Sequence, residues 1–366
     1  MRHPRILAKV RRRTARAAWR VALGPVSGAV PHRYFRSLVE QAWQDSVWKH
    51  IETMDLLRPA YVHRYNFGPE FPAEFRRQVA VDDRYIYGLR DVCVAPRTGL
   101  CWFPGGPILE ESYGPLLQLT GWGYAALDDP LLGCHDTYEE PIVVLPNYPY
   151  FHWLLEALPA ALHGLAARPD ATLLLPDNTP RYVDEAVELL NITRVRRASS
   201  PVHCKELILP ARVPFYNPEE DIAILREKFL PSKSEAVGPI YVSRSNDTRG
   251  PANEDNLERA LETIGIEIVH PQMLPLAAQI ARFSGATFIL GTHGAGLANI
   301  VWSLQRPHVH ELFVDKYFND CYARLSVSLG FPYTPFYCTN KPSPHGSALI
   351  RPFVDAARRV IADCGG

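Results

Sequence analysis

The fold is decided by four apolar runs: IYVSR (residues 240–244), IEIV (266–269), TFILGTHGAGLAN (287–299) and VHELF (309–313). Apolar residues at helical spacing fill the segments between them, near residues 254–264 and 275–283. Short apolar runs that alternate with amphipathic helices are typical of parallel strands buried on both faces. Residues 240–313 therefore predict an α/β half-domain.

A similar alternation occurs earlier in the chain. Its runs are IVVL (142–145), TLLL (172–175) and ELILP (206–210), with helical patterns near 151–165, 182–190 and 222–229. They predict a second parallel sheet covered on both faces. Strand-like runs broken by glycine and proline between residues 91 and 112 predict hairpins ahead of this sheet, and a helical pattern near 352–362 ends the chain.

A segment rich in proline and serine, PSKSEAVGP (231–239), separates the two patterns. A chain of 366 residues is long for one hydrophobic core and sufficient for two. We therefore predict four segments: a basic arm (1–39), an N-terminal α/β domain (40–235), a C-terminal α/β domain (236–345), and a C-terminal helix with its tail (346–366).

The composition is that of a folded globular protein, with 47% hydrophobic and 21% charged residues. Basic and acidic residues number 39 each, so no overall field favours nucleic acid as a partner. The chain has no apolar run of 18 residues and no apolar region of the secretion type. We expect it neither to span a membrane nor to be secreted.

The first 39 residues hold ten Arg or Lys and no Asp or Glu. Apolar residues recur among these arginines at roughly helical spacing, which suits a helix lying on an anionic membrane surface. A solvated basic tail and an organellar transit peptide are the alternatives.

Seven cysteines are scattered along the chain, and none forms a CxxC pair. This pattern argues against a disulfide framework and against a zinc site. We expect a reducing, cytoplasmic setting in which each cysteine is a small buried hydrophobe.

Polar and glycine-rich residues follow the strands of the second pattern. Arg244 ends the first strand, His270 ends the second, and THGAGLAN (292–299) follows the third. The carboxyl ends of parallel strands face one crevice, where ligands bind. Glycines allow backbone N–H groups to approach an anion at the start of a helix, and an arginine fork can bind a diphosphate. The alternatives are a turn that needs glycine for its geometry and an ion pair of Arg244 with Asp247 or Glu254.

Three further residues have open roles. His293 could donate to a phosphate or cap its turn, and Glu311 could accept from ribose hydroxyls or pair with a buried arginine, because an unpaired buried carboxylate is costly. In PNYPYFHWLLEALPAAL (146–162), His152 and Glu156 stand four residues apart and share a helix face. They could act as a general base and its orienting partner, or stabilise an ordinary amphipathic helix.

Together, the segment 146–162, IYVSR, NEDNL (253–257), the run 274–302 and VHELF resemble glycosyltransferase family 61. The resemblance covers about residues 91–313. It implies a GT-B-like pair of Rossmann-type domains that face a cleft, with the acceptor side in residues 40–235 and the donor side in 236–345. It also implies an inverting mechanism without a cofactor or a bound metal ion.

Carried over residue by residue, the resemblance assigns donor binding to Arg244, Asn253, His293, Gly294, Ala295, Gly296, Asn299 and Glu311. The family's Tyr-His-Trp segment falls on Phe151, His152 and Trp153, so phenylalanine stands where tyrosine is commoner. His152 and Glu156 are the candidate catalytic residues.

The expected enzyme moves a sugar from a nucleotide sugar, a UDP-sugar by preference, to a saccharide or glycolipid hydroxyl in capsular, exo- or lipopolysaccharide biosynthesis. It is expected to be cytoplasmic, and peripheral on the inner face of the membrane if the basic arm binds there. One alternative is a Rossmann-type NAD-dependent oxidoreductase or epimerase, which would carry GxGxxG after its first strand. Another is a non-catalytic nucleotide-sugar-binding module.

Overall fold

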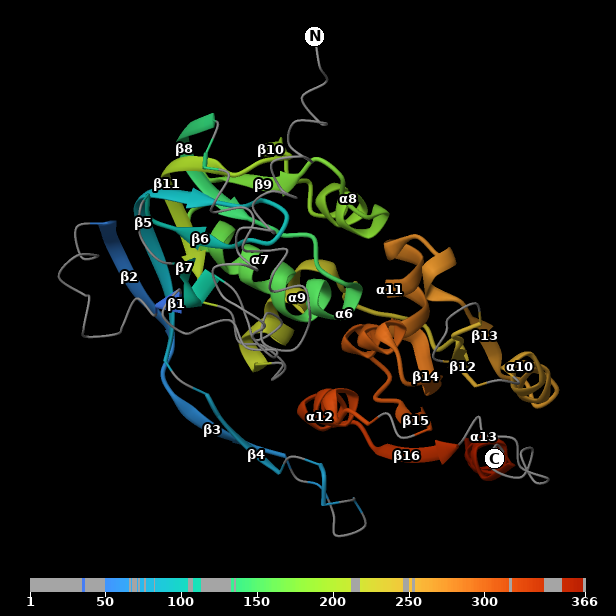
Figure 1. The fold of residues 1–366 in the computed structure, drawn as a ribbon. Helices are drawn as coiled ribbons and strands as arrows, with labels where there is room; N and C mark the ends of the chain where they lie inside the picture. The colour runs from blue at the N-terminus through green and yellow to red at the C-terminus, as the bar shows by residue number, and fades with distance from the viewer. Residues whose placement is uncertain are drawn as a thin grey trace, which may run out of the picture.

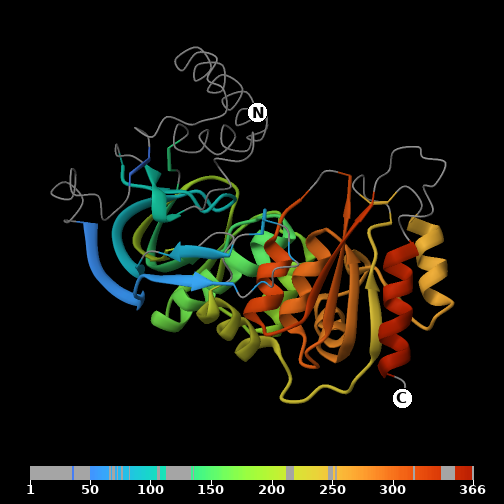
Figure 2. The same cartoon turned by 90° about the horizontal axis from the view of Figure 1, so that it is seen from below.

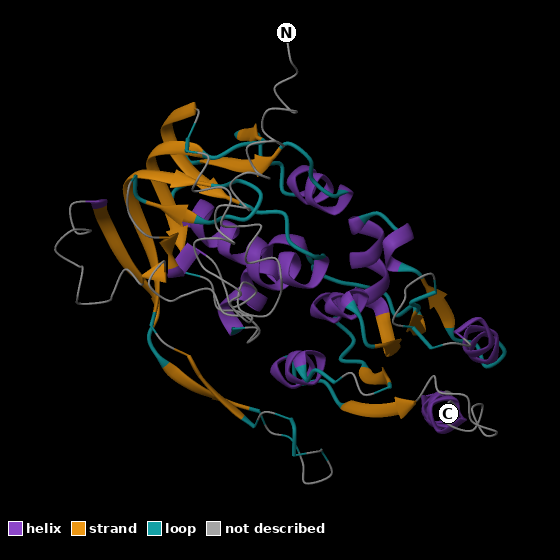
Figure 3. Cartoon of the chain, viewed as in Figure 1, coloured by secondary structure: helices purple, strands orange, loops and turns teal. Residues whose placement is uncertain are grey.

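The structure is a computed structural model of the whole chain (Figure 1). It describes residues 35–36 and residues 50–364, except 66, 68–70, 72, 76, 82, 105–107, 113–132, 135, 212–217, 246–249, 252–253, 316–317 and 339–350. Helices and strands mix throughout the described part, as Figure 3 shows, and both large sheets contain parallel strands. The protein is therefore of the α/β class.

A sheet of five parallel strands is built from the C-terminal part of the chain, in the order β13-β12-β14-β15-β16. Its strands are β12 (Gly238–Val242), β13 (Glu267–Val269), β14 (Ala286–Thr292), β15 (His308–Val314) and β16 (Tyr333–Cys338). The first four confirm the four apolar runs of the sequence. After β12, the chain places β13 on one side of β12 and then β14, β15 and β16 on the other side. The strand order therefore reverses between β12 and β14, and a ligand crevice is expected at their carboxyl ends.

Helices cover both faces of this sheet. α10 (Glu254–Glu262) and α13 (Arg351–Cys364) lie side by side on its outer face, as Figure 2 shows, and pack apolar residues against β12 and β14. α11 (Leu276–Gly285), the 3-10 helix η7 (Ala295–Trp302) and α12 (Cys321–Ser328) pack on the opposite face. The expected helices near 254–264, 275–283 and 352–362 are therefore confirmed.

The other large sheet has nine strands in the order β1-β7-β6-β5-β11-β8-β9-β10, with β2 also paired to β5. These strands are β1 (Phe35–Arg36), β2 (Ile51–Arg58), β5 (Arg84–Val94), β6 (Cys101–Trp102), β7 (Ile108–Leu109), β8 (Asp136–Val144), β9 (Thr172–Pro176), β10 (Val195–Ala198) and β11 (Val202–Pro210). β11, β8, β9 and β10 are parallel, but β5 is antiparallel to β11, β6 and β2. The three apolar runs expected to be parallel lie in β8, β9 and β11, which are parallel, and the hairpins expected between residues 91 and 112 are the antiparallel pairs β5–β6 and β6–β7. These antiparallel strands belong to the same sheet as the parallel ones, because β5 pairs with β11.

The helices of this N-terminal part lie between the two large sheets. α6 (Tyr150–His152), the π-helical turn η5 (Trp153–Ala157) and α7 (Leu158–Ala167) form one continuous helix, which confirms the helix expected near 151–165. α8 (Arg181–Leu189) and α9 (Glu219–Phe229) confirm two more. Single turns of 3-10 helix occur at η4 (Glu110–Ser112) and η6 (Pro271–Met273).

One hairpin extends away from the nine-stranded sheet toward the other. It consists of β3 (Tyr61–Arg64) and β4 (Gln78–Val81), and it reaches toward α12 and β16 in Figure 1. The ring of Phe75 lies 5.0 Å from that of Phe318, and the ring of Phe71 lies 6.1 Å from that of Tyr333. The hairpin region therefore connects the two halves through aromatic contacts.

The hydrophobic core is also shared between the halves. A single cluster of buried side chains contains Val143 and Trp153 of the N-terminal half and Val242, Ile289 and Leu297 of the C-terminal half. Burial of these apolar surfaces stabilises the arrangement of the two sheets as well as each sheet.

Cysteine usage differs from the expectation. A disulfide joins Cys93 of β5 to Cys134, whose Cα atoms are 6.5 Å apart. The expectation that each cysteine is a separate buried hydrophobe is wrong for this pair, because the fold brings together two cysteines that are 41 residues apart in the sequence. Cys101, Cys204, Cys321 and Cys338 are free and buried, while the side chain of Cys364 lies outside the described residues.

Within the part of the chain that the structure describes, no helix has the length and apolar character needed to cross a bilayer. The basic arm, which includes all the arginines proposed to face a membrane, lies outside the described residues except for the short strand β1.

Candidate functional site

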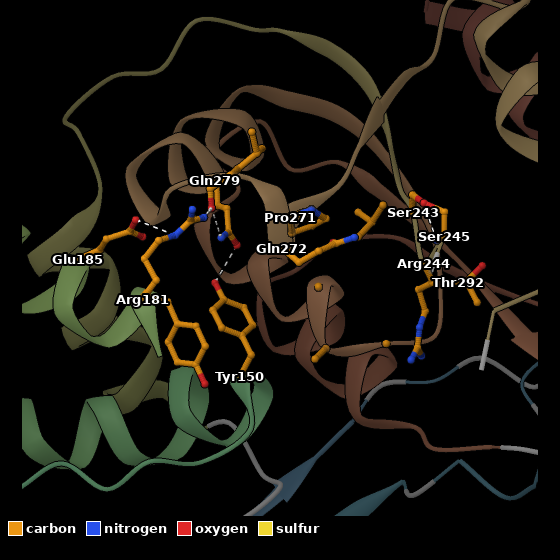
Figure 4. A pocket seen from close by; sticks show the side chains of 16 residues that line it. Tyr150, Arg181, Glu185, Ser243, Arg244, Ser245, Pro271, Gln272, Gln279 and Thr292 are labelled. Atoms are coloured by element: carbon orange, nitrogen blue, oxygen red, sulfur yellow. Dashed lines mark hydrogen bonds and ion pairs between the residues drawn. The ribbon is translucent and has the colours of Figure 1, made fainter. Parts of the chain in front are cut away.

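A cavity of about 470 Å³ opens at the carboxyl ends of β12 and β14, where the chain reverses its direction across the sheet. This volume lies in the range of small-molecule sites. Its walls come from the segments after β12, β13 and β14 and, on the opposite side, from α6 and α8 (Figure 4). The cavity therefore lies between the two halves, at the place where an open parallel sheet binds ligands.

The glycine-rich loop after β14 forms one wall. A Cβ atom at Gly294 would come within 2.7 Å of Cδ and Nη1 of Arg244, and one at Gly296 would come within 3.0 Å of Val242 Cγ1. Both glycines therefore allow a close approach of the backbone to its neighbours. They line the cavity together with Ala295, so backbone groups of the loop face the space where a ligand would lie.

Arg244 lies over this loop and is only 8% exposed. Its Nη1 donates a hydrogen bond to the carbonyl oxygen of His293, and its backbone N–H donates to Glu254 Oε1 at 2.6 Å. Tyr241 Oη also donates to Glu254 Oε1, at 3.0 Å, and burial raises the pKa of this carboxyl group. Glu254 thus holds the backbone at the end of β12, and Arg244 supplies a cation in the cavity wall.

Two serines and a histidine surround the end of β12. Ser243 and Ser245 line the cavity, and Ser243 Oγ donates to Glu258 Oε1 at 2.5 Å. Ser245 Oγ lies 3.1 Å from Nδ1 of His270, the residue that ends the second strand. The Ser245 hydroxyl provides a further hydrogen-bonding group beside Arg244, while the single hydroxyl proton of Ser243 is used by Glu258. The sequence pattern had singled out Arg244 and His270 but not the serines.

His293 and Glu311 form a buried pair below the loop. Nδ1 of His293 is hydrogen bonded to Glu311 Oε1, and Tyr333 Oη donates to Glu311 Oε2. Glu311 is fully buried, and the His293 ring stacks on Phe313. Of the two roles considered for Glu311, the structure shows a buried pair, but with histidine and tyrosine instead of arginine. Neither His293 nor Glu311 lines the cavity.

Asn299 is also buried, and it lies in a network that connects the halves. Its Oδ1 accepts hydrogen bonds from Tyr150 Oη at 2.7 Å and from Trp302 Nε1 at 3.1 Å. Its Nδ2 donates to Gly296 O and to Gln279 Oε1, both at 3.0 Å. Because both polar atoms of the amide are already used twice, Asn299 fixes the glycine loop and does not face a ligand.

His152 and Glu156 share one helix face, as their spacing predicts. His152 Nδ1 lies 3.0 Å from Glu156 Oε1, and their side chains are 15% and 5% exposed. The residues between them belong to a π-helical turn, a feature frequent at functional sites. Neither residue lines the cavity, but the neighbouring Phe151 ring contacts Tyr322, whose ring lies 5.2 Å from that of His293. The contact between the rings of Phe151 and Tyr322 thus lies between the His152–Glu156 pair and the His293–Glu311 pair.

The α8 wall of the cavity was missed by sequence reasoning. It carries Arg181, Tyr182 and Glu185. Arg181 Nη2 donates to Leu274 O at 2.7 Å, and Glu185 Oε2 accepts from the backbone N–H of Leu276 at 2.7 Å. The Arg–Glu spacing of four was visible in the sequence, but it is common on exposed helices and could not show that α8 faces the other half.

Asn253, the remaining candidate, lies outside the described residues. The structure therefore brings Arg244, Gly294, Ala295 and Gly296 together at the cavity. It places His293, Asn299 and Glu311 behind the loop, and His152 with Glu156 on a separate helix.

Residues 150–309 match the model of a protein family described as Glycosyltransferase 61. The matched segment includes the π-helical turn, α8, Arg244 and the glycine-rich loop, and it ends two residues before Glu311. No curated protein matches the chain.

Proposed function

The chain belongs to glycosyltransferase family 61, and from this premise we propose that it transfers a sugar from a nucleotide-sugar donor to a hydroxyl group of a saccharide or glycolipid acceptor. A UDP-sugar is the favoured donor, and polysaccharide biosynthesis is the favoured setting. The observation that carries the proposal is the cavity at the ends of β12 and β14, with Arg244 and the glycine-rich loop in its wall.

The diphosphate of the donor would lie against Arg244, Ser245 and the loop of residues 294–296. The guanidinium group is a planar fork that can bind a diphosphate through two hydrogen bonds, and it is held in place by the His293 carbonyl. Fixed cations and oriented dipoles stabilise negative charge most effectively when water is largely excluded. These groups would therefore stabilise the nucleoside diphosphate as it leaves.

The proposed reaction is a single displacement with inversion at the anomeric carbon. A base removes the proton of the acceptor hydroxyl, the oxygen attacks the anomeric carbon, and the bond to the diphosphate oxygen breaks. We propose His152 as the base and Glu156 as the carboxylate that orients it, supported by their 3.0 Å contact. Arg244 and the loop would neutralise the leaving group, so the scheme requires no bound metal ion and no cofactor.

At the level of the whole chain, we propose a GT-B-like arrangement. Residues 40–235 would form the acceptor-side domain and residues 236–345 the donor-binding domain, with residues 346–366 as an added helix and tail. The strand order of the second sheet and the position of the cavity between the halves support this division. The basic arm would bring the enzyme to an anionic membrane surface.

The decisive experiment measures the affinity of the protein for UDP by calorimetry. Arg244→Ala should weaken binding roughly 10- to 150-fold, which corresponds to about 1.5–3 kcal/mol for hydrogen bonds to a charged group. Arg244→Lys should recover only part of this loss, because lysine lacks the planar fork.

Arg259→Ala is the matched control, since Arg259 is exposed on α10, does not line the cavity, and donates to Asp255 O and Asn256 Oδ1 of its own helix. Its affinity for UDP should equal that of the wild type. If Arg244→Ala and the wild type bind UDP with equal affinity, Arg244 does not contribute to donor binding.

A further inference from the structure

The cavity has two chemically different ends. Figure 4 shows Ser243, Arg244 and Thr292 at one side of the view and Tyr150, Arg181 and Glu185 at the other. Pro271 and Gln272 lie between them. A nucleotide sugar whose diphosphate occupies the Arg244 end must place either its base or its sugar at the α8 end.

The α8 end presents rings whose hydroxyl groups already have partners. Tyr182 Oη donates to the carbonyl oxygen of Tyr148 at 2.9 Å, and Tyr150 Oη donates to Asn299 Oδ1 at 2.7 Å. The two rings contact each other at 5.0 Å in an edge-to-face arrangement. These tyrosines therefore offer aromatic surface to the cavity and not hydroxyl groups.

The charged groups at this end are also engaged. Arg181 pairs with Glu185 at 3.1 Å and donates to Leu274 O, while Glu185 accepts from the backbone N–H of Leu276. Both side chains thus fasten the segment after β13, whose Pro271 and Leu274 add apolar surface to the cavity. Aromatic and apolar surface therefore makes up much of this end, and Arg181 and Glu185 are engaged with each other and with the segment after β13.

We infer that the α8 end is the subsite for the nucleobase of the donor, with the Tyr182 ring as its main contact; this inference rests on the proposed function. A buried hexose would need hydrogen-bond partners for several hydroxyls, and hydroxyls left unpaired are costly. A nucleobase has apolar faces that pack on aromatic rings and needs few polar contacts. The N-terminal half therefore contributes to donor recognition, and the sugar points away from α8.

The test compares UDP with inorganic pyrophosphate by calorimetry. Tyr182→Leu should weaken UDP binding roughly 5- to 100-fold, the effect of losing one base–aromatic contact. It should leave pyrophosphate binding unchanged, because pyrophosphate lacks the base. Tyr182→Phe keeps the ring and should bind UDP more tightly than Tyr182→Leu. Glu188→Gln is the matched control and should bind UDP like the wild type, because Glu188 is exposed on α8 and does not line the cavity. In contrast, Arg244→Ala should weaken the binding of both UDP and pyrophosphate.

Other outcomes are equally informative. If Tyr182→Leu leaves UDP binding intact but weakens a UDP-sugar relative to UDP, the α8 end holds the sugar and the inference is overturned. If Tyr182→Leu weakens the binding of both UDP and pyrophosphate, photo-crosslinking of 4-thio-UDP to the wild type will show where the nucleobase lies. Crosslinks within residues 150–182 or 271–274 support the inference, and crosslinks only elsewhere refute it. A wild type that binds neither ligand would refute the proposed function together with the inference.

Discussion

At the scale of single residues, the geometry of His293 limits what this side chain can do. Its Nδ1 is directed at Glu311, and its carbonyl oxygen accepts from Arg244. A ligand contact by the ring would therefore have to use the other nitrogen. The stronger effect of His293 is on Arg244, because its backbone fixes the guanidinium group over Gly294. The pair with Glu311 in turn holds the loop on β15.

A second histidine, His310, makes stability depend on pH. It is 3% exposed on β15, and within the described part of the chain its Nδ1 has no hydrogen-bond partner. Burial, with a smaller effect of His308, lowers the pKa of His310 to about 3 from 6.5. The unfolded chain thus binds a proton below pH 6.5 that the folded chain does not bind until about pH 3. The free energy of unfolding should therefore decrease as the pH is lowered through this window, by up to about 1.4 kcal/mol per pH unit.

His310→Phe should remove this contribution. The neighbouring rings of Phe288 and Phe336 provide an environment for another aromatic side chain. We expect wild type to lose about 2 kcal/mol more than the variant between pH 7 and pH 5, measured as the free energy of unfolding in urea. Parallel losses in the two proteins would show that His310 is not the titrating group.

At the scale of elements, the sequence predicted well which segments form buried strands and helices, but it did not predict which strands lie next to each other in the N-terminal sheet. The strands β12 and β14 contain continuous apolar runs, β15 alternates apolar with polar residues, and the helices between the strands have clear amphipathic spacing. β16, with the sequence YTPFYC, was missed because its residues are mostly half-buried and Pro335 interrupts the pattern. The hairpins near residues 91–112 were expected, but the pairing of β5 with β11 in one sheet was missed, because periodicity does not show which strands become neighbours.

The same limit applies to the candidate site. Arg244 and the glycine loop could be placed because they follow strands, and strand ends of one parallel sheet converge. The pairing of Glu311 with His293 and Tyr333, and the position of α8, depend on how β16 and the two halves pack. No local pattern encodes these contacts.

The helix with the π-helical turn yields a prediction about catalysis. If His152 removes the acceptor proton and Glu156 orients it, His152→Gln and Glu156→Gln should each lower turnover ~10²–10⁴-fold. UDP affinity should stay unchanged, because neither residue lines the cavity. The measurement is turnover with the UDP-sugar that stabilises the protein most against heat, since a ligand that prefers the folded state raises its stability.

Glu188→Gln is the matched control for these variants, because Glu188 is exposed on α8. It should turn over like the wild type. Wild-type turnover in both His152→Gln and Glu156→Gln would show that the pair only stabilises its helix.

At the scale of the whole molecule, the contacts between the halves are numerous and varied. Arg226 of α9 donates to Val301 O at 2.8 Å and to Ser303 O at 3.0 Å, so it caps the end of η7. The Phe229 ring lies 5.4 Å from that of Trp302. Together with the shared core, these contacts hold the cavity walls in a fixed relation, which favours a preformed ligand site.

Because the core is shared, the two halves should unfold together although the chain is long enough for two cores. Far-UV circular dichroism and tryptophan fluorescence should give coincident urea transitions, and the calorimetric and van't Hoff enthalpies should agree. Arg226→Ala removes the hydrogen bonds to the carbonyl groups of Val301 and Ser303 at the end of η7 and should lower stability by about 1–3 kcal/mol. Arg282→Ala is the control, because the partly exposed pair of Arg282 with Glu267 contributes little. Two separate transitions in the wild type would show that the halves are energetically independent despite their common core.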